Sequence, residues 1–299
     1  MKKIWKREDG AVMVLVALAM SGFLALTALV LDGGSIYLAR NQLQKTVDAA
    51  ALAGAQDLPT FPETASQSAK WVATQNGGAT SLSVEFLSDH KGIRVNGEKK
   101  VNLTFGNALG FDDPIVTASA VVQLAPITSA KGAIPLGVQN NTDMTQGDLI
   151  ELKVGDPVVG NFGAIELTGS GARNYRDDFI NGFDKTLHVG QMLSTEPGKM
   201  SGATKEAVDY RISLCPDATF DNFSPSCQRV VLVMVYKPVN VDETKIKEIE
   251  IVGFASFFLE GTAPNDDSVV LGRFIQTTHN GGSDPDQYNY GSYGLKLIQ

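Results

Sequence analysis

Residues 11–31 form an uninterrupted apolar run, AVMVLVALAMSGFLALTALVL, that contains no charged side chain. At about 1.5 Å of rise per residue, a helix over this run would be about 31 Å long, close to the thickness of a bilayer's hydrocarbon core. The run therefore predicts one membrane-spanning helix, anchored by side chains such as those of Leu15, Leu18, Phe23 and Leu26. This span decides which solvent the rest of the chain meets.

The flanks of the run predict its orientation. Lys2, Lys3, Lys6 and Arg7 precede it, and cationic flanks stay on the cytoplasmic side during insertion. We therefore expect a single-pass protein with a cytoplasmic N-terminus and everything after Asp32 outside the cytoplasm. Two alternatives stay open. A cleavable signal peptide is disfavoured by the length of the run and by the lack of a clean A-x-A at its distal edge, and the third possibility is a buried core helix of a soluble protein.

Composition bounds the remaining chain. Its 299 residues, 43% of them hydrophobic, are enough for one large or two modest folded units beyond the anchor. The net charge is −8 although the N-terminal flank is basic. Such a surface repels nucleic acid, whose binding depends on neutralising phosphates, so we expect no nucleic-acid partner.

The two cysteines, Cys215 and Cys227, enclose a stretch rich in Asp, Pro, Ser and Asn that is typical of a loop. Outside the cytoplasm, two nearby cysteines most simply form a disulfide. A metal site would need further ligands, and His90, His188 and His279 are distant in the sequence. We therefore predict a disulfide.

The helical pattern continues beyond the membrane as a stalk to about residue 58, with apolar residues at three- and four-residue spacings. Gly33 and Gly34 could kink or briefly interrupt this helix. Its last turns carry small side chains, and Ala50, Ala51 and Gly54 are candidates for close helix packing. They would pack either on the chain's own sheet or on a partner helix.

The fold class expected is α+β. Residues 59–130 predict a small unit on the stalk helix, with a helix over residues 63–76 whose Trp71 we expect in the core, followed by antiparallel strands in SVEFL, GIRV, KVNLTF and IVTASAVVQL. Residues 131–299 predict a mostly-β unit with strands in DLIELKV, GAIEL, LHVGQML, RVVLVMVY, EIEIVGFASFFLEG and SVVLGRFIQ and a helix near TKEAVDYRI. The tail HNGGSDPDQYNYGSYG is expected to be a loop.

The first 58 residues resemble the N-terminal segment of the TadG-like proteins of the tight-adherence (Tad/Flp) pilus-assembly system. The resemblance rests on EDGAVMVLVAL and LDGGSIYLARNQLQKTVDAAALAGA, in that order. It implies a membrane-anchored, extracytoplasmic role in building or stabilising a thin pilus, with the lipid bilayer and other pilus-assembly proteins or pilin as partners.

The sequence differs from two groups of Tad relatives in ways that bear on its expected function. Pilin-like relatives are cut after a glycine and favour a glutamate five residues later, but here Leu15 follows Gly10 at that spacing. An assembly factor is therefore favoured over a processed pseudopilin. Larger relatives carry a D-x-S-x-S cation site, and that motif does not occur here.

The sequence carries none of the common catalytic or nucleotide-binding motifs, so we expect no enzyme. The chain lacks G-x-S-x-G, G-x-G-x-x-G and G-x-x-x-x-G-K-[ST]. Acidic pairs such as Asp266 and Asp267 are most simply solvated loop carboxylates, with incidental calcium binding as the alternative. We expect no catalytic residues, cofactor or metal. The rival function is a membrane-tethered adhesin or ligand-binding β-domain unrelated to pili. The oligomeric state stays open.

Overall fold

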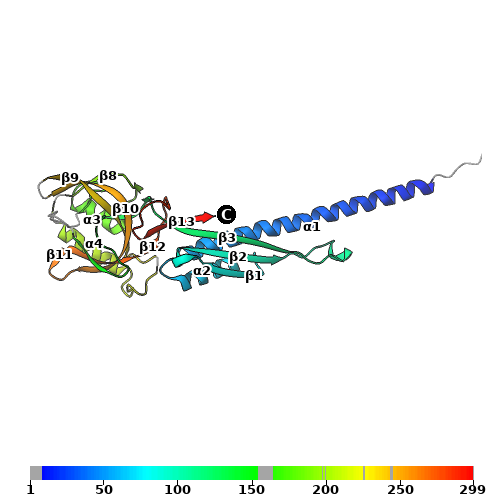
Figure 1. Ribbon diagram of the computed structural model, residues 1–299, viewed down its shortest axis with the longest axis horizontal. Coiled ribbons are helices and arrows are strands. Elements are labelled where there is room, and N and C mark those ends of the chain that lie inside the picture. Colours follow the sequence, from blue (N-terminus) through cyan, green and yellow to red (C-terminus); the bar gives the residue numbers. More distant parts are fainter. Residues whose placement is uncertain are drawn as a thin grey trace, which may run out of the picture.

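The computed structural model describes residues 9–153, 164–196, 198, 200–224, 226–242 and 245–298. The basic flank and Gly163 of the predicted strand GAIEL lie outside these residues. The rest of GAIEL forms only two isolated bridges, Ala164 with Leu136 and Ile165 with Thr195. Mixed α+β structure is confirmed: a long N-terminal helix leads to two sheets (Figure 1).

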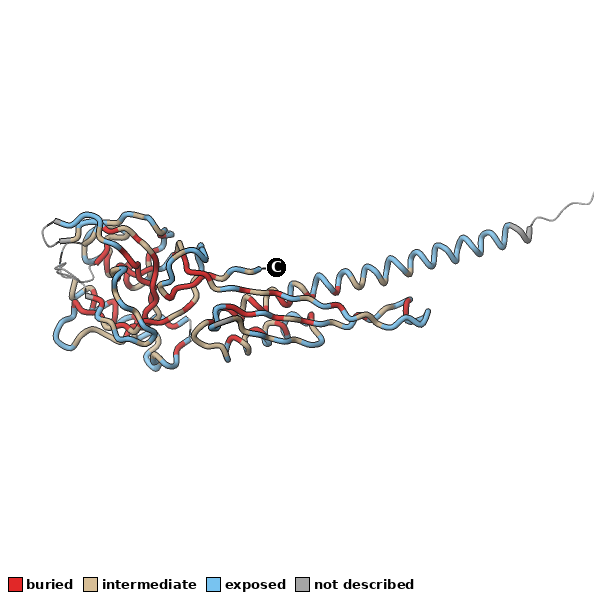
Figure 2. The backbone as a smooth tube through the Cα atoms, in the orientation of Figure 1, coloured by how far each residue is buried: buried red, intermediate tan, exposed pale blue. Residues whose placement is uncertain are grey.

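Helix α1 (Asp9–Ala55) is a single continuous helix. It passes through Gly33 and Gly34 without the kink or interruption that the sequence suggested. Both glycines lie in open space, so no neighbouring group forces a bend. The N-terminal part of α1 projects away from the rest of the molecule and is exposed, whereas its C-terminal part is buried against the first sheet (Figure 2).

The first sheet has the strand order β1-β2-β3-β13-β12, antiparallel except for the β12–β13 pair. Its strands are β1 (Ser81–Phe86), β2 (Gly92–Lys100), β3 (Ile115–Pro126), β12 (Thr277–Thr278) and β13 (Ser292–Ile298). Helix α2 (Pro62–Asn76) and the C-terminal part of α1 pack together over it and share one apolar core with β2 and β3. Short 3-10 turns η1 (Ser88–His90) and η2 (Asn107–Leu109) interrupt the connections.

The second sheet has the order β5-β9-β10-β11-β6, and β8 pairs with β10. Its strands are β5 (Ala133–Gln139), β6 (Leu149–Lys153), β8 (Met192–Ser194), β9 (Val230–Asp242), β10 (Lys245–Ala263) and β11 (Asp266–Ile275). Helices α3 (Ala172–Asn181) and α4 (Ser201–Ser213) contribute side chains to its core, and β4 (Ser129–Ala130) pairs with β7 (Leu187–His188). Helix α4 was predicted. Helix α3 was missed, because only Tyr175 and Phe179 mark its buried face in a polar segment.

The domain boundary predicted at residue 130 does not separate the two sheets. Strand β13, from the end of the chain, pairs with β3 in the first sheet, and residues 292–294 of the tail expected to be a loop belong to it. Leu295 and Leu297 pack against the first core and alternate with the exposed Lys296 and Ile298, as expected of a strand with one buried face. The second sheet is thus built largely from residues inserted between β3 and β13.

Two local predictions were wrong. Trp71 is 65% exposed, because α2 buries its alanine face, Ala65, Ala69 and Ala73, and residue 71 falls on the opposite side. The strand predicted in KVNLTF leaves the sheet after Lys100. Its backbone N–H groups at Thr104 and beyond bond to a carboxylate on α1 instead of to a strand.

Candidate functional site

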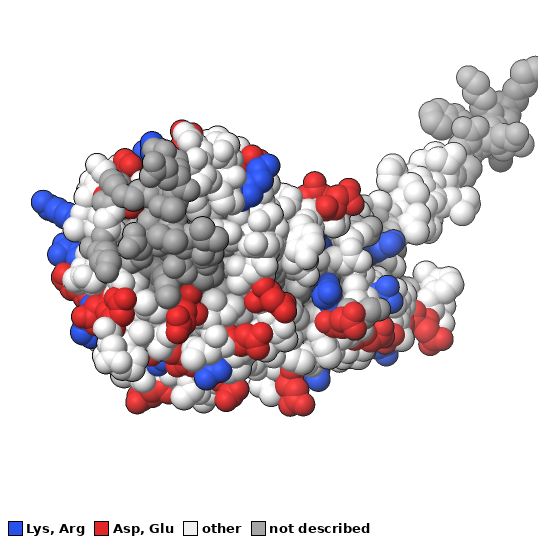
Figure 3. All heavy atoms as spheres, turned by 60° about the vertical axis from the view of Figure 1, so that its left-hand side comes forward, with Lys and Arg blue, Asp and Glu red and all other residues white. Residues whose placement is uncertain are grey.

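The predicted anchor side chains lie on the exposed part of α1. Leu15, Leu18, Phe23 and Leu26 are between 61% and 70% exposed. This part of α1 shows neither acidic nor basic side chains (Figure 3). Since none of the most apolar stretch is buried inside the protein, the core helix of a soluble protein is not the arrangement observed. Within the described chain, α1 is the one helix long and apolar enough to cross a membrane.

The few polar side chains in this stretch bond to the helix itself. The Ser21 and Thr27 hydroxyls each donate to a backbone carbonyl four residues earlier, at 2.8 Å. Such bonds satisfy hydroxyl groups without water, as an apolar solvent requires. The stretch is therefore chemically suited to lipid along its whole length.

Asp32, immediately after the apolar run, holds the loop between β2 and β3. Its carboxylate accepts the backbone N–H groups of Thr104 at 2.8 Å, Phe105 at 3.1 Å and Gly106 at 2.6 Å. A Cβ at Gly106 would lie 2.6 Å from the Leu103 side chain, so glycine permits this close approach. The sequence marked Asp32 only as the end of the run, since its partners are more than 70 residues away.

The predicted packing residues Ala50 and Ala51 are fully buried, and Gly54 is buried as well. A Cβ on Gly54 would lie 2.8 Å from the backbone oxygen of Ala65 and 2.7 Å from Cδ1 of Ile93. The small side chains of α1 therefore admit α2 and β2 of the same chain. In this structure they are occupied by intramolecular packing.

The predicted disulfide is present: Cys215 and Cys227 are joined, with their Cα atoms 5.9 Å apart. The loop it closes carries Phe223, whose ring lies 5.2 Å from that of Phe61, next to α2. Phe223 also packs on Phe258 of β10, at 5.4 Å. The disulfide loop thus packs between Phe61, at the start of α2, and β10 of the second sheet.

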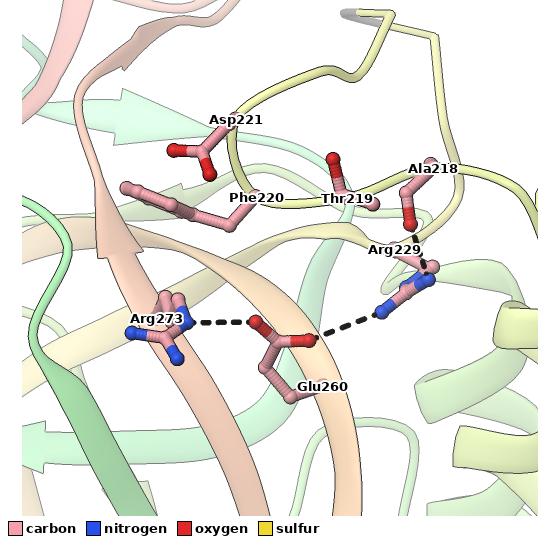
Figure 4. Close-up of a pocket in the computed structure, with 7 residues that line it drawn as sticks. All are labelled: Ala218, Thr219, Phe220, Asp221, Arg229, Glu260 and Arg273. Carbon is pink, nitrogen blue, oxygen red and sulfur yellow. Dashed lines mark hydrogen bonds and ion pairs between the residues drawn. The ribbon is translucent and has the colours of Figure 1, made fainter.

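Beside this loop, an open pocket is lined by Arg229, Glu260 and Arg273 together with residues 218–221 (Figure 4). Glu260 accepts from Arg273 at 2.8 Å and from Arg229 at 3.3 Å. Arg229 also donates to the carbonyls of Leu259 and Ala218, and its guanidinium lies 4.3 Å above the Phe258 ring. Burial lowers the pKa of Arg229, and Glu260 opposes that effect. Arg229, Glu260 and Arg273 hold the start of β9, β10 and β11 together.

A second pocket reaches His279, whose Nε2 lies 2.7 Å from the Ser256 hydroxyl oxygen. Ser256 is fully buried and also lies 2.7 Å from the Ser292 hydroxyl. Burial lowers the pKa of His279 to about 4, so its ring is neutral near pH 7. None of the residues lining this pocket is acidic. The cluster connects β10 of the second sheet to β13 of the first.

Among the described residues, no group of three or more His, Cys, Asp or Glu side chains could hold a metal ion. The acidic pair Asp266 and Asp267 lies at the start of β11, where Asp266 bonds to the Ser268 hydroxyl at 2.5 Å.

Comparison with known proteins bears on α1. Residues 10–57 match the family described as putative Flp pilus-assembly TadE/G-like. The matched segment coincides with α1, from its second residue to the turn that follows it. The resemblance inferred for the first 58 residues is confirmed. Neither the curated proteins nor the solved structures provide a match.

Proposed function

We propose that this chain, which carries a TadE/G-like segment at residues 10–57, is a membrane-anchored component of a Flp/Tad-type pilus system. It acts outside the cytoplasm in pilus assembly, anchoring or stabilisation, through contacts with the other assembly proteins or pilin. One observation carries the proposal. The family segment is the same continuous helix that exposes an apolar stretch and then enters the first core.

Two features support the orientation in this proposal. Lys2, Lys3, Lys6 and Arg7 favour a cytoplasmic N-terminus by the positive-inside rule. The Cys215–Cys227 disulfide suits an oxidising compartment on the other side. Both point to the same topology for residues beyond Asp32.

We further propose that the protein acts mechanically and not as an enzyme. The arginines of the first pocket bond to Glu260 and to backbone carbonyls. The histidine of the second pocket is tied to a fully buried serine that links the two sheets. Both groups of side chains serve to hold strands together.

The anchor is tested by replacing Leu15→Arg together with Leu18→Arg. An arginine at the centre of a spanning helix costs about 2.5–3.5 kcal/mol of insertion free energy, and two arginines in the N-terminal half of the apolar run should together abolish membrane retention. Leu38→Arg is the matched control, since Leu38 is equally exposed on the same helix but beyond the apolar run. Fractionation that stays unchanged in the double variant would refute the anchor.

The pilus role is tested in intact cells. Crosslinking followed by capture of the tagged full chain should recover a component of the pilus system, and the Leu15→Arg, Leu18→Arg variant should recover none. Membrane retention without any pilus component in the wild-type capture would instead favour the tethered adhesin or ligand-binding protein.

A further inference from the structure

The hairpin of β2 and β3 runs along α1 toward the apolar run. Gly97 lies against Leu43 and Val47, and the Lys99 ammonium donates to Gln42 at 3.0 Å. The following residues reach Asp32, which is about 16 Å nearer the N-terminus than Leu43 at 1.5 Å per residue. The tip therefore lies level with the end of the apolar run, and it points along α1 toward the N-terminal end (Figure 1).

The tip has the composition of a membrane-contacting loop. Residues 103–111, LTFGNALGF, contain no charged side chain. Leu109 is 74% exposed and Phe111 is 64% exposed. Neighbouring exposed apolar side chains mark an interaction surface more often than scattered single ones do. Here they sit beside the helix that could span the membrane.

Most backbone N–H groups of the tip are hydrogen-bonded within the protein and do not depend on water. Asp32 accepts the N–H groups of residues 104–106, and Asp113 accepts that of Leu103 at 3.0 Å. Within the tip, the N–H groups of Leu109 and Phe111 donate to Gly106, and that of Gly110 donates to Asn107. Unsatisfied backbone groups are costly away from water, so this internal bonding permits the loop to enter the interface between headgroups and acyl chains.

We propose that this tip, residues 103–111, is a second membrane contact: Leu109 and Phe111 insert into the headgroup and acyl boundary of the bilayer, and Asp32 holds the loop at that depth. This inference rests on the proposed membrane anchoring of α1. A helix alone can rotate about its axis and tilt. A second contact beside it fixes the rotation and tilt of the folded units relative to the membrane surface.

The test uses tryptophan fluorescence of the full chain in vesicles of brominated and ordinary phosphatidylcholine. Trp5→Phe and Trp71→Phe remove the two native tryptophans. Phe111→Trp then reports on the tip, and Leu26→Trp reports on the anchor. In a separate sample with Trp5→Phe alone, the exposed native Trp71 on α2 is the control outside the membrane.

We expect the brominated lipid to remove at least half of the emission of the Phe111→Trp and Leu26→Trp variants and to leave that of Trp71 unchanged. If Leu26→Trp is quenched but Phe111→Trp behaves like Trp71, the tip lies outside the bilayer and the inference is overturned while the anchor stands. The exposed side chains of the tip would then more simply contact a protein partner. If Leu26→Trp is not quenched, the anchor and the inference both fail.

The role of Asp32 is tested in the same samples. Asp32→Ala should reduce the quenching of the Phe111→Trp reporter by at least half and leave that of Leu26→Trp unchanged, because only the loop loses its acceptor. Asp112→Ala is the matched control, since it removes an exposed acid next to the tip. Equal quenching in the Asp32→Ala and Asp112→Ala variants would overturn the holding role of Asp32.

Discussion

Gly54 of α1 lies close against α2, and replacing it tests whether this contact sets the stability of the first unit. In the Gly54→Ala variant, the new Cβ would lie 2.8 Å from the Ala65 carbonyl oxygen and 3.1 Å from Ala69 Cβ. Ile93 Cδ1, at 2.7 Å, can rotate away. The carbonyl oxygen belongs to the backbone of α2, so the helix itself must move by several tenths of an ångström.

The expected change in the free energy of unfolding of Gly54→Ala is the sum of two opposed effects. Overpacking of a filled core costs about 1–3 kcal/mol, whereas alanine gains about 1 kcal/mol over glycine in a helix. Gly34→Ala is the matched control, because Gly34 lies on the same helix in open space. The helix gain is common to both variants. Their difference in the free energy of unfolding, about 2 kcal/mol, therefore measures the packing alone.

Pulse proteolysis of the full chain in detergent, across a urea series, measures this difference. With a denaturant dependence of about 2 kcal/mol per molar urea, the Gly54→Ala midpoint should lie about 1 M below that of Gly34→Ala. Equal midpoints, or an increase for Gly54→Ala, would refute the close packing of α1 on α2.

Three further predictions concern the second sheet. Cys215→Ser with Cys227→Ser should lower the free energy of unfolding by about 3 kcal/mol, as chain entropy predicts for a loop of 12 residues, and reducing agent should then have no further effect on the urea midpoint. Burial lowers the pKa of His279 from its usual 6.5 to about 4, so between these pH values the unfolded chain binds a proton that the folded chain does not. The folding stability present above pH 6.5 is therefore lost as pH falls toward 4, by at most about 3 kcal/mol. His279→Gln should flatten this part of a plot of melting temperature against pH; an unchanged slope would contradict the assignment. Arg211→Met should cost about 2–3 kcal/mol in urea unfolding, because the buried guanidinium donates to two backbone carbonyls, one of them on α3, that would lose their donor. Lys205→Met breaks an exposed ion pair on the same helix and should lower the urea midpoint much less.

Local patterns were sufficient for much of the architecture. The apolar run, the stalk helix, the long strands β9 to β11 and the disulfide depend on residues close together in the sequence. Their periodicity or spacing therefore marks them. Trp71 shows the limit of that reasoning, since a large aromatic side chain suggests a core position, whereas alanines form the buried face of α2.

The features that position the candidate site depend on contacts between distant residues. Asp32 finds its N–H donors more than 70 residues later, and β13 pairs with a strand that ends at Pro126. The sequence pattern around Asp32 or β13 does not indicate which distant residues it will contact. The sequence predicts a strand over residues 103–105 of the tip, because their β-favouring side chains are also ones that suit a membrane interface.

The return of β13 to the first sheet means that the second unit is attached by two covalent connections and not by a single linker. Tension applied to that unit would pass into two adjacent strands, β3 and β13, and would have to shear their ladder of backbone hydrogen bonds before either came free. Truncation after residue 130 would leave β3 as an unpaired edge, open to pairing with another chain. The first sheet is therefore complete only when synthesis has reached β13.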